Sequence, residues 1–183
     1  YASVLKGKND LRWRIEHAQI IHPDDFEKFG NYSIIPSIQS THATSDMYWA
    51  DERIGDIRIQ SAYAYRKLME ENGWLPNGSD FPVESINPLF GFYALSIRKD
   101  HKGYPGTGFQ AENALGREDA VKAMTIWAAK AAFEENEKGS LEAGKMADFI
   151  ITGVDLLNIP PADIPATRIL ETWLGGVKVY SLD

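Results

Sequence analysis

The chain has 183 residues, of which 44% are apolar and 25% are charged, a composition typical of a soluble globular protein. It contains no cysteine, which excludes disulfides, thiolate metal sites and a cysteine nucleophile. The formal net charge is −7 and no stretch is rich in Lys and Arg, so nucleic acid and an anionic membrane surface are not expected partners. No apolar run approaches the roughly 20 residues that a membrane-spanning helix needs.

The first residues resemble the middle of a helix that began upstream. The segment from Tyr1 to Lys6 has no initiator methionine, no signal-peptide pattern and no helix cap. We therefore expect this chain to be the C-terminal part of a longer protein and to pack against the rest of its own polypeptide. An upstream segment would hold any export signal, so the localisation stays open, with the cytoplasm favoured.

Strand and helix patterns alternate through the first part of the chain. Leu11, Trp13 and Ile15 alternate with charged residues, which indicates a strand. The expected strands are 11–21, 32–39 and 74–77. The expected helices are 26–29, with a helix start at 22–25, and 56–72, 88–99 and 117–135. Loops are expected at 40–53 and 101–113. This alternation is the signature of βα units around a parallel sheet.

The pattern changes after Gly139. Residues 146–152 and 168–180 are expected strands, and Gly175-Gly176 is typical of a tight hairpin turn. We therefore expect two parts, 1–138 built from βα units and 139–183 built from β-hairpin structure.

A histidine and an aspartate each follow an apolar strand. Side chains at the carboxyl ends of strands face the site in βα architectures, and imidazole is the commonest metal ligand, so His17 is a candidate. The alternative for a single histidine is a core position that donates to a backbone carbonyl. Asp80 follows two small residues that allow a tight turn, and an Asx turn or helix cap is its alternative. Together, His17 and Asp80 predict one shared metal site.

Other polar residues are candidates for secondary roles. His42 follows the second strand, where it is expected to touch the substrate or to orient a ligand; a solvated loop histidine is the alternative. Arg53 is expected to pair with a carboxylate or to be solvated. His22 and His101 are expected to have a capping role and a surface position.

Three motifs in one order resemble a known family. They are Ile15-Glu16-His17-Ala18-Gln19, Ile38-Gln39-Ser40-Thr41-His42 and Gly78-Ser79-Asp80-Phe81-Pro82-Val83. They are similar to the sixth, seventh and eighth barrel strands of the amidohydrolase superfamily, in the branch called amidohydrolase family 3, which includes N-substituted formamide deformylases. Residues 123–129, 139–151 and 171–180 resemble later parts of the same enzymes. Ser40 departs from the pattern, since the family usually has proline there.

The resemblance implies an α/β fold with the last three βα units of a metal-dependent hydrolase (β/α)8 TIM barrel, followed by the C-terminal strands of a composite β-sandwich. It implies one or two divalent metals, with zinc expected. By this resemblance His17 is a metal ligand, and Asp80 is both a metal ligand and the proton-transfer residue. His42 is expected to polarise the carbonyl, and Gln39 and Arg53 are expected to bind the substrate. The remaining ligands would lie upstream of this chain.

The expected activity is hydrolysis of a non-peptide C–N bond, amide or formamide-like, in a small-molecule substrate by metal-activated water. A non-catalytic binding module and a hydrolase of lactones or phosphoesters are the alternatives, because fold does not fix substrate. Aromatic residues in the loops, namely Tyr48, Trp49, Tyr104 and Phe109, hint at an apolar or aromatic substrate group.

The chain by itself is expected to be inactive. Two credible ligands are fewer than the three that a catalytic zinc site normally has, so weak metal binding and no hydrolysis are expected. Open sheet edges are also expected, and pairing in a homo-oligomer is one way to cover them.

Overall fold

The structure is a computed structural model that describes residues 2–183. The helices are α1 (Ala2–Leu5), α2 (Phe26–Asn31), α3 (Ser40–Asp46), α4 (Ala50–Arg58), α5 (Tyr65–Asn72), α6 (Pro88–Ile97), α7 (Arg117–Met124) and α8 (Ile126–Ala131). The strands are β1 (Arg14–Glu16), β2 (Ile35–Ser37), β3 (Phe149–Thr152), β4 (Ile169–Leu174) and β5 (Val177–Ser181). Short 3₁₀ helices cover Pro23–Asp25, Ile59–Ser61, Ala111–Asn113 and Pro161–Ala166.

A short parallel ladder organises the first part of the chain. Strands β1 and β2 pair in parallel, and Ile38, just beyond β2, forms a parallel bridge with Asn77. The Ile38 amide donates to Pro76 O at 3.0 Å, and the Gly78 amide donates to Ile38 O at 2.9 Å. Three chain segments therefore run side by side in one direction, and their carboxyl ends share one edge.

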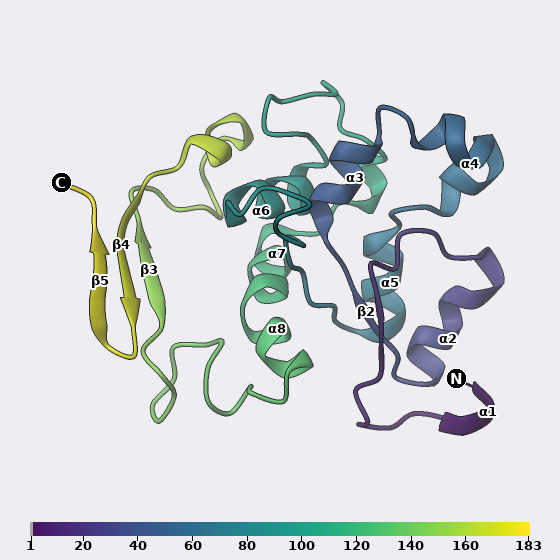
Figure 1. The fold of residues 1–183 in the computed structure, drawn as a ribbon, viewed down its shortest axis with the longest axis horizontal. Helices are drawn as coiled ribbons and strands as arrows, with labels where there is room; N and C mark the ends of the chain where they lie inside the picture. Colours follow the sequence, from purple (N-terminus) through teal and green to yellow (C-terminus); the bar gives the residue numbers. More distant parts are fainter. Residues whose placement is uncertain (1) are drawn as a thin grey trace.

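Helices pack against this ladder to form the core (Figure 1). Contacts between α2 and α5 and between α3 and α6 hold the layers together. The buried core includes Phe26, Phe29, Ile34, Ile35, Ile38, Tyr65, Leu68, Leu75, Phe92 and Leu95. Burial of such apolar side chains stabilises the fold by roughly 1.5–3 kcal/mol for each large residue. The core thus fixes the strand ends from which the site is built.

The C-terminal part is an antiparallel sheet in the order β3–β4–β5. In Figure 1 this sheet stands to one side of the helical part. Gly175 and Gly176 join β4 to β5, and both have positive φ values of 56° and 78°. That conformation is the one that a tight hairpin turn requires, so the predicted turn is confirmed.

The loop predicted at 40–53 is wrong, because α3 and the first half of α4 occupy it. Helix α3 has the sequence STHATSD, and its residues Ser40 to Thr44 are all buried. Since most of its buried side chains are polar, no apolar period marks this helix in the sequence.

The helix predicted at 56–72 is also wrong in its extent. Helix α4 has a kink at Gly55, with φ 78°, and the helical structure is interrupted before α5 begins at Tyr65. Tyr63 lies in that interruption with φ 52°. The helix predicted at 117–135 likewise divides into α7 and α8, because Thr125 has a non-helical backbone.

The strands predicted at 11–21, 32–39 and 146–152 exist but are shorter than expected. β1 covers only Arg14–Glu16 within 11–21, and β2 only Ile35–Ser37 within 32–39. Residues 74–77 form a single bridge instead of a strand. β3 begins at Phe149 instead of residue 146. Among the described residues, no helix combines the length and apolar character needed to cross a membrane.

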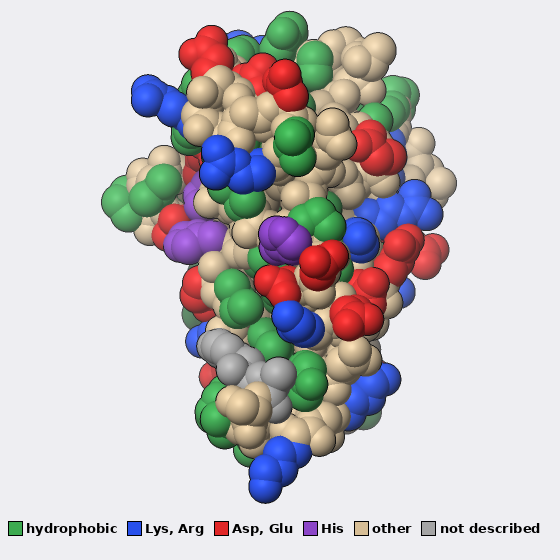
Figure 2. Space-filling model, turned by 90° about the vertical axis from the view of Figure 1, so that its right-hand side faces the viewer, with side chains coloured by type: hydrophobic (Ala, Val, Ile, Leu, Met, Phe, Trp, Pro, Cys, Tyr) green, Lys and Arg blue, Asp and Glu red, His purple; other side chains and the backbone are tan. Residues whose placement is uncertain are grey.

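Figure 2 shows one face of the molecule, where acidic and basic side chains are interspersed between apolar ones. No continuous basic area is visible on this face.

Candidate metal centre

His17 lies directly after β1, where the chain turns away from the parallel ladder. His17 and Ala18 both have positive φ values, 68° and 40°, which few residues adopt outside turns. The turn leaves the His17 side chain partly exposed at the strand end. Its Nδ1 lies 2.8 Å from Gln39 Oε1, within hydrogen-bond distance.

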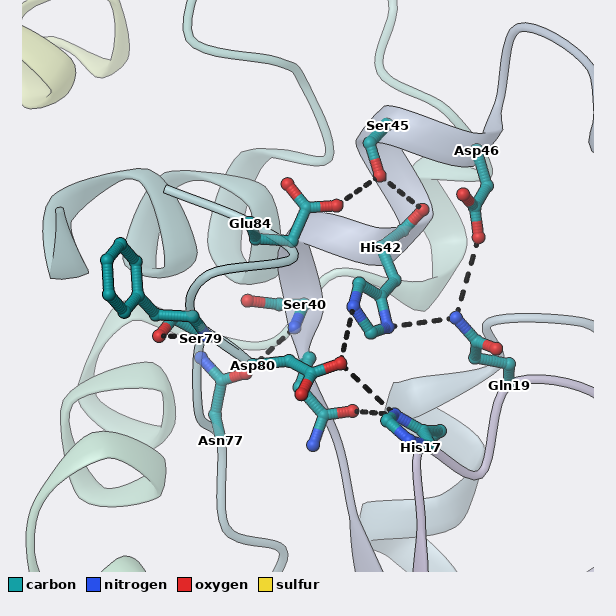
Figure 3. Close-up of polar contacts among 12 residues, drawn as sticks. His17, Gln19, Ser40, His42, Ser45, Asp46, Asn77, Ser79, Asp80 and Glu84 are labelled. Carbon is teal, nitrogen blue, oxygen red and sulfur yellow. Dashed lines mark hydrogen bonds and ion pairs between the residues drawn. The ribbon is translucent and has the colours of Figure 1, made fainter. Parts of the chain in front are cut away.

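Asp80 reaches the same place from the third segment of the ladder. It follows the bridge at Asn77, and its own φ of 58° places it in a tight turn. Its Oδ2 lies 4.0 Å from His17 Nδ1 and 3.6 Å from His42 Nε2 (Figure 3). The sequence prediction required His17 and Asp80 to converge, and the structure brings them together.

His42 projects from α3 into the same cluster. Its side chain is only 7% exposed, whereas those of His17 and Asp80 are 48% and 36% exposed. The His17 and His42 rings lie 5.5 Å apart between centroids. His42 Nε2 is buried and has no hydrogen-bond partner among the described residues.

The donor set of the cluster fits a divalent metal ion. His17, His42 and Asp80 each offer one ligand atom, and these atoms all lie within 4.8 Å of one another. Two ligands bound at about 2.0–2.2 Å to a tetrahedral zinc ion lie roughly 3.4 Å apart. The 3.6 Å from His42 Nε2 to Asp80 Oδ2 is near that value, and the 4.0 Å from His17 Nδ1 to the same oxygen is wider. Imidazole nitrogen with carboxylate oxygen is a set that zinc accepts readily.

A second layer of polar residues lies behind His42. Gln19 Nε2 lies 2.9 Å from His42 Nδ1 and 3.4 Å from Asp46 Oδ2. The Tyr63 hydroxyl donates to the same Asp46 oxygen at 2.8 Å. Sequence reasoning missed these roles of Gln19, Asp46 and Tyr63. Gln19 stands two residues after His17, and that proximity was the only signal for it in the sequence.

The two predicted substrate-binding residues lie in different surroundings. Gln39 is buried, and its side-chain oxygen contacts His17. Arg53 is exposed on α4, and the described residues show no hydrogen bond or ion pair between it and the cluster. A substrate contact by either residue stays a prediction.

The remaining histidines have the local roles that were expected. His22 caps the 3₁₀ helix at Pro23–Asp25, where its ring accepts from the Asp24 amide. His101 is exposed and stacks on Phe90 at 4.9 Å between ring centroids.

An open cleft lies between α3 and the segments that follow Asp80 and α6. Its volume is about 490 Å³, and its lining includes Thr41, Tyr48, Glu84, Phe90 and His101. Thr41 immediately precedes His42 on α3, but His17, His42 and Asp80 are not among the residues that line this cleft. Of the four aromatic residues singled out in the sequence, Tyr48 lines this cleft and stacks on Tyr104 at 5.5 Å between ring centroids.

The chain is similar to several known proteins. The sequence model described as the amidohydrolase family matches residues 3–180. Protein LONG AFTER FAR-RED 3 of Arabidopsis thaliana is 36% identical over 98% of this chain, and N-substituted formamide deformylase of Arthrobacter pascens is 22% identical over 98% of it. These matches cover 31% and 33% of the two relatives, so this chain spans about a third of their length.

A solved structure has the same fold over most of the chain. It is described as an uncharacterized metal-dependent hydrolase from Pyrococcus horikoshii, and it is 28% identical with a TM-score of 0.72. The similarity covers 83% of this chain and 31% of that protein.

Proposed function

This chain belongs to the amidohydrolase family, in its family 3 branch, and we propose that it supplies part of a divalent-metal centre that hydrolyses a non-peptide C–N bond. Its α/β part forms the last three βα units of a (β/α)8 barrel, followed by β-sandwich strands. The single observation that carries the proposal is the convergence of His17 and Asp80 at neighbouring strand ends, with His42 beside them.

His17 and Asp80 would hold the metal through a ring nitrogen and a carboxylate oxygen. When bound, a divalent cation supplies Lewis acidity, which makes a water molecule acidic enough to attack at neutral pH. Zinc is the ion that we propose, since nitrogen and oxygen donors suit it and the chain has no thiolate to offer. A catalytic zinc site has three protein ligands, so we propose that further ligands come from outside this chain.

Asp80 would also move the proton. Its carboxylate is the acidic group at the centre of the cluster, with an imidazole on either side. We propose that it accepts the proton of the attacking water as a general base. It then delivers that proton to the leaving amine as a general acid, which a carbon–nitrogen bond requires for cleavage.

The amide-like substrate class is supported by the name of one relative. The Arthrobacter pascens relative is named a formamide deformylase, and such a reaction releases an amine. The cleft that Thr41 lines, one residue before His42 on α3, carries aromatic and acidic residues, including Tyr48, Phe90 and Glu84. We propose that a substituent of the amine lies there.

The proposal is tested with the longest natural polypeptide that contains this chain. Zinc content is measured, and hydrolysis is assayed on N-formyl amines, N-acyl amines, cyclic amides, lactones and phosphoesters. We expect bound zinc and cleavage of an N-formyl or N-acyl amine. Asp80→Asn should lower kcat at least about 100-fold, since it removes the general base. Ser79→Ala is the control, because the Ser79 hydroxyl only accepts from the Phe81 amide in this structure. Activity on lactones or phosphoesters alone would contradict the C–N assignment.

A further inference from the structure

His42 lies between two polar groups, one facing each nitrogen of its ring. Its Nδ1 faces Gln19 Nε2 at 2.9 Å, and its Nε2 faces Asp80 Oδ2 at 3.6 Å. A neutral imidazole carries one proton, on one nitrogen or the other. The position of that proton decides whether His42 offers the cluster a hydrogen-bond donor or a lone pair that could bind metal.

The orientation of the Gln19 amide settles which nitrogen is protonated. The Gln19 nitrogen also lies 3.4 Å from Asp46 Oδ2, and an ionised carboxylate can only accept. The reversed amide would place its oxygen against that carboxylate, and two acceptors would repel each other. Gln19 therefore presents N–H groups to both Asp46 and His42, and His42 Nδ1 must accept.

Tyr63 keeps Asp46 in the accepting state. Its hydroxyl donates to Asp46 Oδ2 at 2.8 Å. Burial first, and then this hydrogen bond, raise the pKa of Tyr63, so the phenol keeps its proton at ordinary pH. Asp46 Oδ2 thus faces two donors, the Tyr63 hydroxyl and the Gln19 amide nitrogen, and accepts from both.

We infer that Tyr63, Asp46 and Gln19 fix His42 as the tautomer with its proton on Nε2, so that His42 gives the cluster a hydrogen-bond donor and not a metal ligand. Gln19, Asp46 and Tyr63 are then positioning residues. The catalytic meaning rests on the proposed function: the Nε2–H would donate to the carbonyl oxygen that gains negative charge during attack. The buried and unpartnered His42 Nε2 is available for this role.

The tautomer can be measured directly on the metal-free chain. Long-range ¹H–¹⁵N correlation spectra distinguish protonated from unprotonated ring nitrogens, and His42→Gln assigns the signals of this ring among the four histidines of the chain. We expect a protonated Nε2 and an unprotonated Nδ1. A protonated Nδ1 in the unmodified chain would overturn the inference.

A designed reversal gives a second test. In Q19E/D46N, the new carboxylate at position 19 accepts from His42 Nδ1–H. The new amide at position 46 donates an N–H to the same carboxylate. We expect the proton to move to Nδ1. The Nε2 lone pair is then free to bind metal, so the affinity for Co²⁺ should rise by about tenfold or more. Residues that hydrogen-bond to a metal ligand commonly change metal affinity by such a factor. Q60E/D56N makes the same exchange at two exposed positions, also with no net change of charge, and is the matched control.

An unmoved proton in folded Q19E/D46N would contradict the inference. Circular dichroism checks the fold, and Tyr63→Phe decides the question if the double variant fails to fold. Tyr63→Phe removes only the hydroxyl that donates to Asp46, so a second His42 tautomer should become detectable. A single unchanged His42 tautomer in Tyr63→Phe would then overturn the inference.

These results separate the inference from the proposed function. The tautomer is measured without metal or substrate. If the chain has the Nε2–H form of His42 and the longer polypeptide shows no hydrolysis, only the proposed function is overturned. Hydrolysis together with an Nδ1–H form would overturn this inference alone.

Discussion

Ser40 and Asn77 are joined by a buried hydrogen bond, in which the Ser40 backbone amide donates to Asn77 Oδ1 at 2.8 Å. The bond links the start of α3, which carries His42, to the segment that carries Asp80. The Ser40 hydroxyl adds a bond to Gly91 O at 2.7 Å, so the same residue also fixes α6. The relative position of His42 and Asp80 therefore depends on Ser40.

Ser40→Pro should destabilise the chain by about 1–3 kcal/mol, because buried Asn77 Oδ1 would lose its donor. Proline fits the backbone here, since Ser40 begins α3 and Gln39 before it is extended, with φ −129° and ψ 101°. Urea unfolding of the chain measures the loss. Ser40→Ala keeps the amide and should cost less, so equal losses in the two variants would contradict a role for the amide.

His17→Ala should lower the affinity of the chain for Co²⁺ by at least about tenfold, because a ring nitrogen next to Asp80 is removed. Isothermal titration of the 183-residue chain with Co²⁺ measures the effect. His22→Ala is the matched control, since His22 caps a 3₁₀ helix and does not belong to the cluster. An equal loss in both variants would show that His17 is not a specific ligand.

The Arg12–Glu135 ion pair should make stability depend on pH in acid. Arg12 contacts both Glu135 carboxylate oxygens, at 2.8 and 2.5 Å. Hydrogen bonding from Arg12 lowers the pKa of Glu135 from 4.5 to about 2. A lowered pKa in the folded state means that the stabilisation is fully present above about 4.5 and is lost as the pH falls toward about 2.

Glu135→Gln should therefore lower Tm at neutral pH, and the difference from the unmodified chain should shrink between about pH 4.5 and 2. Thermal unfolding followed by circular dichroism at several pH values measures this. Glu137→Gln is the control, because Glu137 lies on the same segment and makes no ion pair with Arg12. A constant Tm difference across this range would contradict the assigned pKa.

Gly30→Ala should be strongly destabilising because α2 and α5 touch there. A Cβ atom at Gly30 would lie 2.2 Å from the backbone oxygen of Glu71, so one helix would have to move. Overpacking of this kind costs about 1–3 kcal/mol or more. Gly106→Ala is the control, since nothing lies within 4 Å of a Cβ atom at that position. Urea unfolding of both variants should show a loss only for Gly30→Ala.

The sequence allowed the convergence of His17 and Asp80 to be predicted, because parallel strands place their carboxyl ends at one edge. It did not reveal α3, because the buried residues Ser40, Thr41 and His42 are polar. A search for apolar residues at helical spacing does not detect a helix whose buried residues are polar. It also did not reveal the partners of His42. Gln19 and Tyr63 are brought into the site by turns with positive φ at His17, Ala18 and Tyr63. Neither a strand period nor a helix period in the sequence predicts the direction of the chain at such turns.

The helix predicted at 117–135 is a second feature that the side-chain period did not predict correctly. Its apolar spacing is correct on both sides of Thr125, but the backbone there, with φ −126° and ψ −98°, ends one helix and begins another. The Thr125 hydroxyl donates to Val121 O at 2.7 Å. Such a side-chain bond competes with helical hydrogen bonding, and a helical period in the side chains carries no trace of it.

Within the described residues, the parallel sheet has the order β1–β2, so β1 stands at one end of it, where a further parallel strand would be added. His17 follows β1 immediately. A strand that docked on this edge would hold the His17 backbone in place, so strand assembly and cation capture would be thermodynamically linked. Each event would then strengthen the other by the same factor.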